Sequence, residues 1–384
     1  MKNFINFHVL ISHSPSCLNR DDMNMQKSAV FGGVRRVRVS SQSLKRALRI
    51  SPYFHKNVSQ PSRRTRELGL LLSELSNKLE QSFPKELIKK SISFLADARN
   101  IEVEDNHADA VAPWCSEEVA WLCSQLESNA ILMQFCDDYL AISGDGANEK
   151  KRKRTIEKFT YKEIEKNDQL AGLFLAFEKN VDLALWGRMA ASGLMKPVDG
   201  ALAVAHALTT HSVDSDIDWF TAVDDLQELG SGHLDTQEFS SGVFYRYASL
   251  NIGQLQENLG GGSREKVLEI ASHVLHMLST VVPSAKQQSF AAHNLADLAL
   301  VSFSDLPISL ANAFEQPVQQ NNGSGYRGPS MAALHDYWQK VHKGYGLAER
   351  CGQFSLSDSA SPEGIVVKQS LEDLKAWVSN NGEG

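Results

Sequence analysis

Cysteine is scarce in this 384-residue chain, and what there is does not pair up by spacing. The five cysteines, at positions 17, 115, 123, 136 and 351, form an odd set without a C-x-x-C pair. A disulfide framework needs even, regularly spaced cysteines, and a structural zinc site usually shows paired ones. We therefore expect reduced cysteines inside a core.

Long apolar runs are also missing. No stretch of about eighteen apolar residues occurs, and the first one, from Phe4 to Ile11, is interrupted by Asn6 and His8. This pattern supports neither a membrane span nor a signal peptide. We expect a cytoplasmic protein without a membrane partner.

Recognisable catalytic motifs are absent as well. The sequence has no G-x-S-x-G, no H-E-x-x-H and no phosphate-binding loop with the Walker lysine. His273 and His276 stand three residues apart on an apolar helix without a convincing third ligand, so a pair in the core is favoured over a metal site. We expect no catalytic residue, cofactor or metal.

What the chain does have is an uneven distribution of charge. Residues 1–66 carry thirteen Lys and Arg against two Asp, a net charge of +11. The remainder of the chain carries a net charge of −18, which gives the total of −7. A basic segment on an acidic body can attract phosphate locally without binding nucleic acid indiscriminately. Nucleic acid is therefore a plausible partner of the first sixth of the chain.

Hydrophobic periodicity indicates an α+β protein with a helical block inserted between strand-bearing halves. We expect a loop from His13 to Gly33 and a helical block over residues 60–182, with Ser116 capping one of its helices. The other expected elements are strands at 3–11, 37–39, 242–248 and 298–303, an extended hairpin or arm within 192–224, and a polar loop at 316–330. Helices are expected through 43–49, after a cap at Ser40 or Ser41, and at 264–278 and 371–378.

Two basic surfaces emerge from this assignment. Gln42, Lys45 and Arg49 share one face of the helix that Ser40 or Ser41 caps, and Arg35, Arg36 and Arg38 precede it. The second surface is the run of Lys150, Lys151, Arg152, Lys153 and Arg154. Each either follows a phosphate backbone or is a solvated basic helix. The aromatic strand around Phe244, Tyr245 and Tyr247 similarly either stacks bases or fills the core.

Four strings together resemble the CasC family, the backbone subunits of the type I-E CRISPR surveillance complex Cascade. They are FINFHVLISHSPSCLNRDD from Phe4, RRVRVSSQSLKRALR from Arg35, HSVDSDIDWFTAVDDL from His211 and TQEFSSGVFYRYA from Thr236. The resemblance implies a palm with a modified RNA-recognition-motif (ferredoxin-like) fold, helical fingers and a β-hairpin thumb. It assigns residues 1–58 and 183–384 to the palm, 59–182 to the fingers and about 192–224 to the thumb.

The same resemblance implies a non-catalytic subunit that polymerises along CRISPR RNA, displaces guide bases at intervals and presents the guide to target DNA. Its partners would be CRISPR RNA, target DNA, further copies of itself and other Cascade subunits. By matching position, the guide contacts are Arg20, Ser40, Gln42, Lys45, Arg46 and Arg49. The residues against the displaced base are Met189, Phe220 and Thr221, and the contacts to DNA are Lys150, Lys151, Arg152, Lys153 and Arg154.

One alternative remains open. Asp21 and Asp22 lie in the expected loop, and related backbone subunits of another CRISPR branch cleave RNA from that region. A metal-dependent ribonuclease acting through Asp21 or Asp22 is therefore the competing hypothesis. Adjacent residues of an extended chain point to opposite sides, which disfavours one metal held by both carboxylates.

Overall fold

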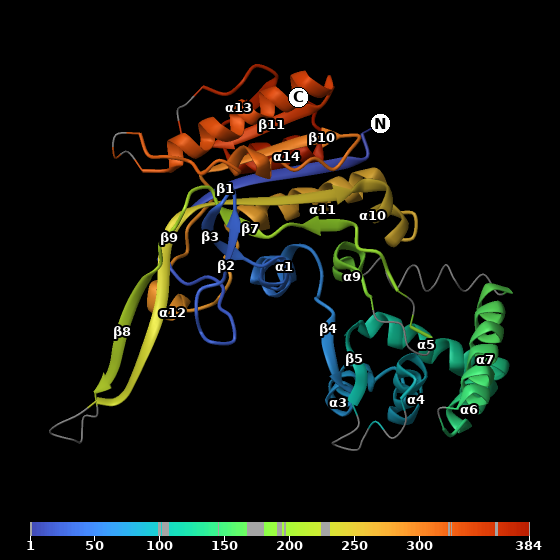
Figure 1. Cartoon of the computed structure of the whole chain (residues 1–384). Helices are drawn as coiled ribbons and strands as arrows, with labels where there is room; N and C mark the ends of the chain where they lie inside the picture. The colour runs from blue at the N-terminus through green and yellow to red at the C-terminus, as the bar shows by residue number, and fades with distance from the viewer. Residues whose placement is uncertain are drawn as a thin grey trace. The chain divides into compact units, whose positions relative to one another are not determined.

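The computed structural model describes residues 2–98, 101, 107–144, 146–166, 180–189, 194–195, 197–223, 231–321, 323, 325–357 and 360–383. The chain forms two compact units (Figure 1). The first combines Met1–Asn57, Leu202–Ile252 and Arg264–Gly384, and the second combines Val58–Ala201 and Gly253–Ser263. The second unit is thus inserted into the first. The functional division at residues 58 and 182 stays a prediction.

The first unit is built on a large sheet. Its strand order is β12-β11-β10-β1-β9-β7-β3-β2, and β6 and β8 also pair with β9. The central strand β1 is antiparallel to both β9 and β10. The strands are β1 (Phe4–Ser16), β2 (Ser28–Phe31), β3 (Val34–Val39), β6 (Leu202–Val204), β7 (Ala207–Thr209), β8 (Asp216–Val223), β9 (Ser231–Asn251), β10 (Leu298–Ser304), β11 (Arg350–Ser355) and β12 (Ile365–Lys368).

Helices cover both faces of this sheet. On one face Leu10, Tyr245 and Leu300 pack with Leu334 and Trp338 of α13. On the other face the Trp377 ring of α14 packs edge-on against Phe303, and Figure 1 shows α11 and α13 on opposite sides of the sheet. The helices of this unit are α1 (Ser41–Ile50), α2 (Pro52–Asn57), α11 (Arg264–Thr280), α12 (Gln287–Phe290), the short 3-10 helix η1 (Ala311–Phe314), α13 (Arg327–Tyr345) and α14 (Leu371–Ser379).

Covering both faces settles the role of the aromatic strand. Phe244 and Tyr245 of β9 are buried, and the Tyr245 hydroxyl donates to or accepts from His8 Nδ1 at 2.8 Å. Burial lowers the pKa of His8 to about 3, so its ring stays neutral and can share this bond. These aromatic side chains fill the core, and the alternative that they stack bases is wrong.

Two expectations for the irregular segments need correction. The expected loop from His13 to Gly33 contains the end of β1 and all of β2, because Gly32 and Gly33 form a two-residue turn to β3 with φ of 60° and 76°. The expected polar loop at 316–330 gives way to α13, which begins at Arg327. Tertiary packing of Met331 and Leu334 on the sheet stabilises this start.

A two-stranded ribbon extends from the sheet. In β8, Asp216 pairs with Phe239 and Thr221 pairs with Leu234 of β9, and Figure 1 shows the ribbon running outward from the rest of the first unit. Residues 224–230, between the two strands, lie outside the described residues. The ribbon shares residues 216–223 with the arm expected within 192–224.

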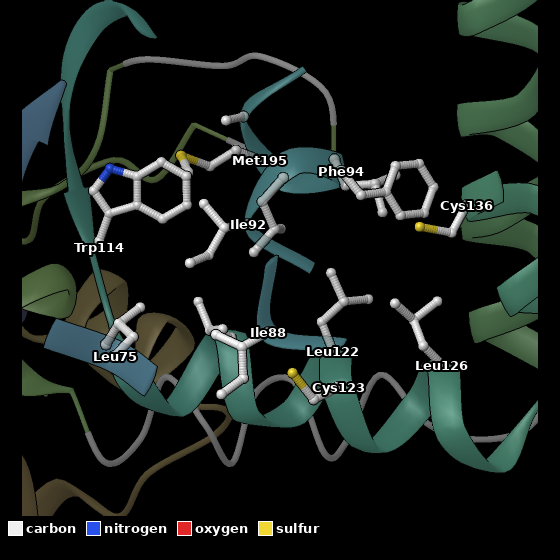
Figure 2. Packing of buried hydrophobic residues seen from close by; sticks show 14 of the residues in the cluster. Leu75, Ile88, Ile92, Phe94, Trp114, Leu122, Cys123, Leu126, Cys136 and Met195 are labelled. Carbon is white, nitrogen blue, oxygen red and sulfur yellow. The ribbon is translucent and has the colours of Figure 1, made fainter. Parts of the chain in front are cut away.

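The second unit is largely helical. The leucine periodicity predicts one helix face made of Leu68, Leu71, Leu72, Leu75 and Leu79. The first four are buried in α3, Leu79 is partly buried, and they join a core with residues from α4, α5 and α6 (Figure 2). Each such leucine contributes about 1.5–3 kcal/mol when fully buried. The elements are β4 (Arg63–Glu67), α3 (Leu68–Leu79), α4 (Lys85–Ala96), β5 (His107–Trp114), α5 (Ser116–Ser128), α6 (Ala130–Ala141), α7 (Ala147–Lys166), α9 (Val181–Trp186) and α10 (Ile252–Asn258).

Two details of this unit differ from expectation or go beyond it. The cap of α5 is Cys115, which makes no side-chain capping bond, and the predicted cap Ser116 is already the first helical residue. The antiparallel pair β4–β5 was not expected. Residues 167–179, within the expected helical block, lie outside the described part of the chain.

All five cysteines are free and buried, as expected. Among the described residues, no helix is both long enough and apolar enough to cross a membrane.

Candidate nucleic-acid interface

The basic helix α1 forms where the sequence predicts it. Ser40 is the N-cap, and its hydroxyl oxygen accepts a hydrogen bond from the Ser43 N–H at 3.2 Å. Leu44 and Leu48 are buried and hold the helix against the sheet. Leu44 packs in a cluster with Val37 and Val39 of β3. The helix therefore presents its remaining, polar positions away from this contact.

Arg20 is brought to the beginning of α1 by its neighbour Asn19. The Asn19 side-chain oxygen accepts from the Ser40 N–H at 2.8 Å, and its carbonyl accepts from the Lys27 N–H at 2.9 Å. Arg20 itself is half-buried and donates to Asn24. The structure thus places two predicted guide contacts, Arg20 and Ser40, at one end of the helix.

The other predicted residues of α1 differ in exposure. Gln42 and Arg46, one turn apart, are exposed, and Lys45 is half-buried. Arg49 is buried, with 6% of its surface exposed. The expected face of Gln42, Lys45 and Arg49 therefore becomes less accessible toward the end of the helix, and the accessible cationic position is Arg46.

The N–H groups at the beginning of α1 are partly occupied by protein acceptors. His206 Nδ1 accepts from the Ser41 N–H at 3.0 Å, in addition to the Ser40 bond to Ser43. Partial burial and then the Arg38 guanidinium lower the pKa of His206, so its ring is neutral at pH 7 and able to accept. Anion binding by this helix end is correspondingly reduced.

The arginines that precede α1 mainly serve the fold. Arg36 is fully buried and donates to the carbonyls of Phe31, Thr209 and Phe314 at 2.8–3.2 Å. Arg35 is exposed but forms a 2.7 Å ion pair with buried Glu238. The proposed continuation of the phosphate surface through Arg36 is therefore wrong, because its donors are used inside the protein.

Asp21 and Asp22 have different environments. Asp21 Oδ1 accepts from the N–H groups of Met23 and Met25, both at 2.9 Å, and so closes the turn that follows. Asp22 is exposed. The described residues that could jointly hold a metal ion do not include either aspartate.

Met189, in the second unit, is a highly exposed apolar side chain on a well-supported backbone. It is 98% exposed, and the preceding residue, Arg188, exchanges two 2.8 Å backbone hydrogen bonds with Val198. The Arg188 guanidinium also forms a bidentate pair with Glu118 at 2.7 and 2.9 Å. The Met189 side chain is therefore accessible to a ligand, on a backbone that these bonds to Arg188 support.

Phe220 and Thr221 lie in the first unit, on β8. Their backbones pair with Asp235 and Leu234 of β9. On the same strand Trp219 is 68% exposed and Ile217 is also exposed. The sequence analysis did not single out the exposed Trp219. Side chains alternate between the two faces of a strand, so the position next to Phe220 could have been predicted to face the opposite side.

The basic run lies at the beginning of α7. Ile156 and the buried Thr160 and Ile164 hold this helix on the helical core, which leaves the positions of Lys150, Lys151, Arg152 and Arg154 exposed. Lys151 and Arg152 also line a shallow hollow between α6 and α7. Lys153 differs, because its ammonium group pairs with Asp97 at 2.6 Å.

The fold defines a mixed α/β protein similar to chains of CRISPR RNA-guided surveillance complexes. One chain of a structure titled "CRISPR RNA-guided surveillance complex, pre-nicking" is 25% identical, with a TM-score of 0.76 over 99% of this chain and 100% of that chain. A chain of another "CRISPR RNA-guided surveillance complex" is 24% identical, with a TM-score of 0.60 over 98% and 99%. No curated protein matches the sequence.

The family is shown by sequence as well. The CT1975-like protein family, Cas_CT1975, matches residues 5–379. The chain belongs to this family.

Proposed function

We propose that the chain is a non-catalytic, guide-RNA-binding backbone subunit of a type I-E CRISPR surveillance complex, as the resemblance to CasC implies. The observation that carries the proposal is the end-to-end match, at a TM-score of 0.76, to a chain of an RNA-guided surveillance complex. The basic first sixth of the sequence is the second support, because it supplies cations where a guide backbone would bind.

The sheet topology supports a palm of the RNA-recognition-motif type. That fold has four antiparallel neighbours in the order 4-1-3-2, with a helix between strands 3 and 4. The strands β10, β1, β9 and β7 follow the same order, and α11 connects β9 to β10. In this proposal the helical unit provides the fingers, and the β8–β9 ribbon provides the thumb.

The guide would be held through its backbone. Arg46, Gln42 and Lys45 of α1 offer donors to phosphate and sugar oxygens, and Arg20 extends this surface at the beginning of the helix. Ser40, which is buried, would act there through the helix cap that it forms. Arg49 would act from its buried position by supporting the helix and completing the positive field. Such contacts fix position and register and carry no base code, which suits a subunit that accepts any guide.

Apolar residues would separate the guide bases. Met189, Phe220 and Thr221 would lie against a displaced nucleotide, where an apolar surface offsets the lost base stacking without sequence preference. Successive copies of the chain would repeat this along the RNA. Lys150, Lys151, Arg152 and Arg154 would contact target DNA, whereas Lys153 would hold α7 to Asp97. Other Cascade subunits complete the proposed set of partners.

The competing ribonuclease hypothesis makes the opposite prediction for one substitution. If the chain is a scaffold, Asp22→Ala leaves guide binding and target-DNA binding within about twofold of the wild type, because an exposed carboxylate offers a phosphate no hydrogen-bond donor and exposed charges contribute little. Guide and target affinities of the reconstituted complex measure this. Loss of a Mg²⁺-dependent RNA cleavage activity in the variant would instead favour the ribonuclease, with Asp305→Ala, another exposed aspartate, as the control.

A further inference from the structure

Three side chains that can ligate a metal ion converge at the end of α13. His342 lies in its last turn, Glu349 immediately precedes β11, and Cys351 is in β11. His342 Nε2 is 2.9 Å from Glu349 Oε2 and 3.9 Å from Cys351 Sγ. The three ligand atoms all lie within 4.8 Å of one another.

The hydrogen bonding of His342 creates a need for a cation. Its Nδ1 atom is 3.0 Å from the Trp338 carbonyl oxygen, which can accept and cannot donate, so Nδ1 must carry a proton. In the neutral ring, Nε2 then presents a lone pair to the carboxylate of Glu349. Two acceptors 2.9 Å apart repel each other unless a proton or a metal ion lies between them. A histidine oriented by a backbone carbonyl in this way is the usual arrangement of a metal ligand.

The carboxylate is ready to accept that cation. The Glu349 side chain is 3% exposed, and its Oε1 atom is enclosed without a well-formed hydrogen bond. An enclosed carboxylate oxygen with unused hydrogen-bonding capacity favours a bound cation.

The third group distinguishes a metal ion from a proton. A proton shared by His342 and Glu349 does not require a third group, whereas zinc is bound by N, O and S ligands together. Ligands about 2.0–2.3 Å from a tetrahedral zinc ion lie about 3.3–3.6 Å apart, and the observed 2.9 and 3.9 Å bracket this range, within the reach of small side-chain rotations. Burial raises the pKa of Cys351 to about 12, so its thiol would ionise through metal binding.

We propose that His342 Nε2, the Glu349 carboxylate and Cys351 Sγ form a binding site for a zinc-type divalent ion. On binding, the Cys351 thiol loses its proton to solvent and the sulfur becomes a thiolate ligand. The ion would join the end of α13 to β11 and so stabilise the layer that covers one face of the sheet. The spacing His-x6-Glu-x-Cys contains no C-x-x-C, which is why the sequence suggested no such site. This inference is independent of the proposed function.

Metal analysis of the purified full-length chain tests the site. We expect about one zinc ion per chain after purification without chelator. After a chelator has removed the metal, added cobalt should bind and give a thiolate-to-metal charge-transfer band. Because outer-shell partners alone are worth about 10–100-fold in metal affinity, His342→Ala and Cys351→Ser should each weaken binding by at least about 100-fold. His293→Ala, at an exposed histidine of the same unit, should change nothing.

The wild-type protein alone can overturn the proposal, whether or not the variants fold. Suppose that the purified protein carries no stoichiometric zinc, and that the metal-depleted protein shows no cobalt–thiolate band when cobalt is added. His342 and Glu349 are then a proton-bridged ion pair. Cobalt binding without the thiolate band, or undiminished in Cys351→Ser, would equally contradict the three-ligand site.

Discussion

Glu118→Ala is expected to lower the free energy of unfolding by about 3–5 kcal/mol, because it removes the carboxylate that compensates the buried Arg188 guanidinium. The side chains of Arg188 and Glu118 are 0% and 5% exposed, and they share two hydrogen bonds. Burial would lower the pKa of Arg188, but the adjacent carboxylate outweighs burial and raises it, so the guanidinium stays charged. Denaturant unfolding of the full chain, followed by circular dichroism, measures the loss.

The same helix provides the control. Glu127→Ala in α5 removes an exposed carboxylate and should change stability by no more than about 0.5 kcal/mol. A similarly small effect of Glu118→Ala would show that the buried pair is not what holds the segment that carries Met189. If Met189 acts on a guide base, the destabilised variant should also reduce base unstacking, reported by 2-aminopurine in the guide.

Removing two charges from α1 is expected to weaken guide binding by about tenfold for each phosphate that is left without its cation. The variant is Lys45→Gln with Arg46→Gln, which keeps the side chains long and polar. The logarithm of the affinity should also depend less steeply on salt, with a slope smaller by about 1.4 for single-stranded RNA. Arg49 is left intact, because substituting a buried arginine would combine a folding defect with a binding defect.

Fluorescence anisotropy with two unrelated guide sequences, over a series of salt concentrations, provides the measurement. Lys56→Gln in α2, which removes an exposed charge of the same unit, is the matched control and should bind like the wild type. Equal losses for both guides are expected. A loss confined to one guide would contradict recognition through the backbone.

Much of the fold could be predicted because local signals agree with tertiary packing. The capping serine of α1 marks where that helix begins, and the leucine spacing of α3 describes a buried face that the structure contains. The alternation along β1 identified a strand but not its environment, because Asn6 and His8 are buried as well as the apolar positions. Ser370 and Asp373 form a capping box at the beginning of α14, where the sequence predicts the helix over 371–378. The beginning of α13 escaped prediction, because its first turn is polar and contains glycine and proline, and its stability comes from contacts with the sheet.

The candidate site was less predictable, because charge in the sequence does not reveal which donors the fold consumes. The sequence does not distinguish Arg36 from Arg46. In the structure, Arg36 donates to carbonyls that are distant in sequence, whereas Arg46 is exposed. Arg188 and Glu118 carry no recognisable motif, and only the fold brings them together across seventy residues. Long-range hydrogen bonds of this kind separate structural from ligand-binding arginines.

The central claim, that the chain holds a guide RNA through its backbone, is tested most directly by sequencing the nucleic acid that copurifies with it. The tagged full-length protein is isolated with its native partners, and the bound RNA is extracted and sequenced. We expect small RNAs of uniform length that carry CRISPR repeat sequence and many different spacers. Material without such RNA, which also fails to bind single-stranded RNA at low salt, would contradict the account.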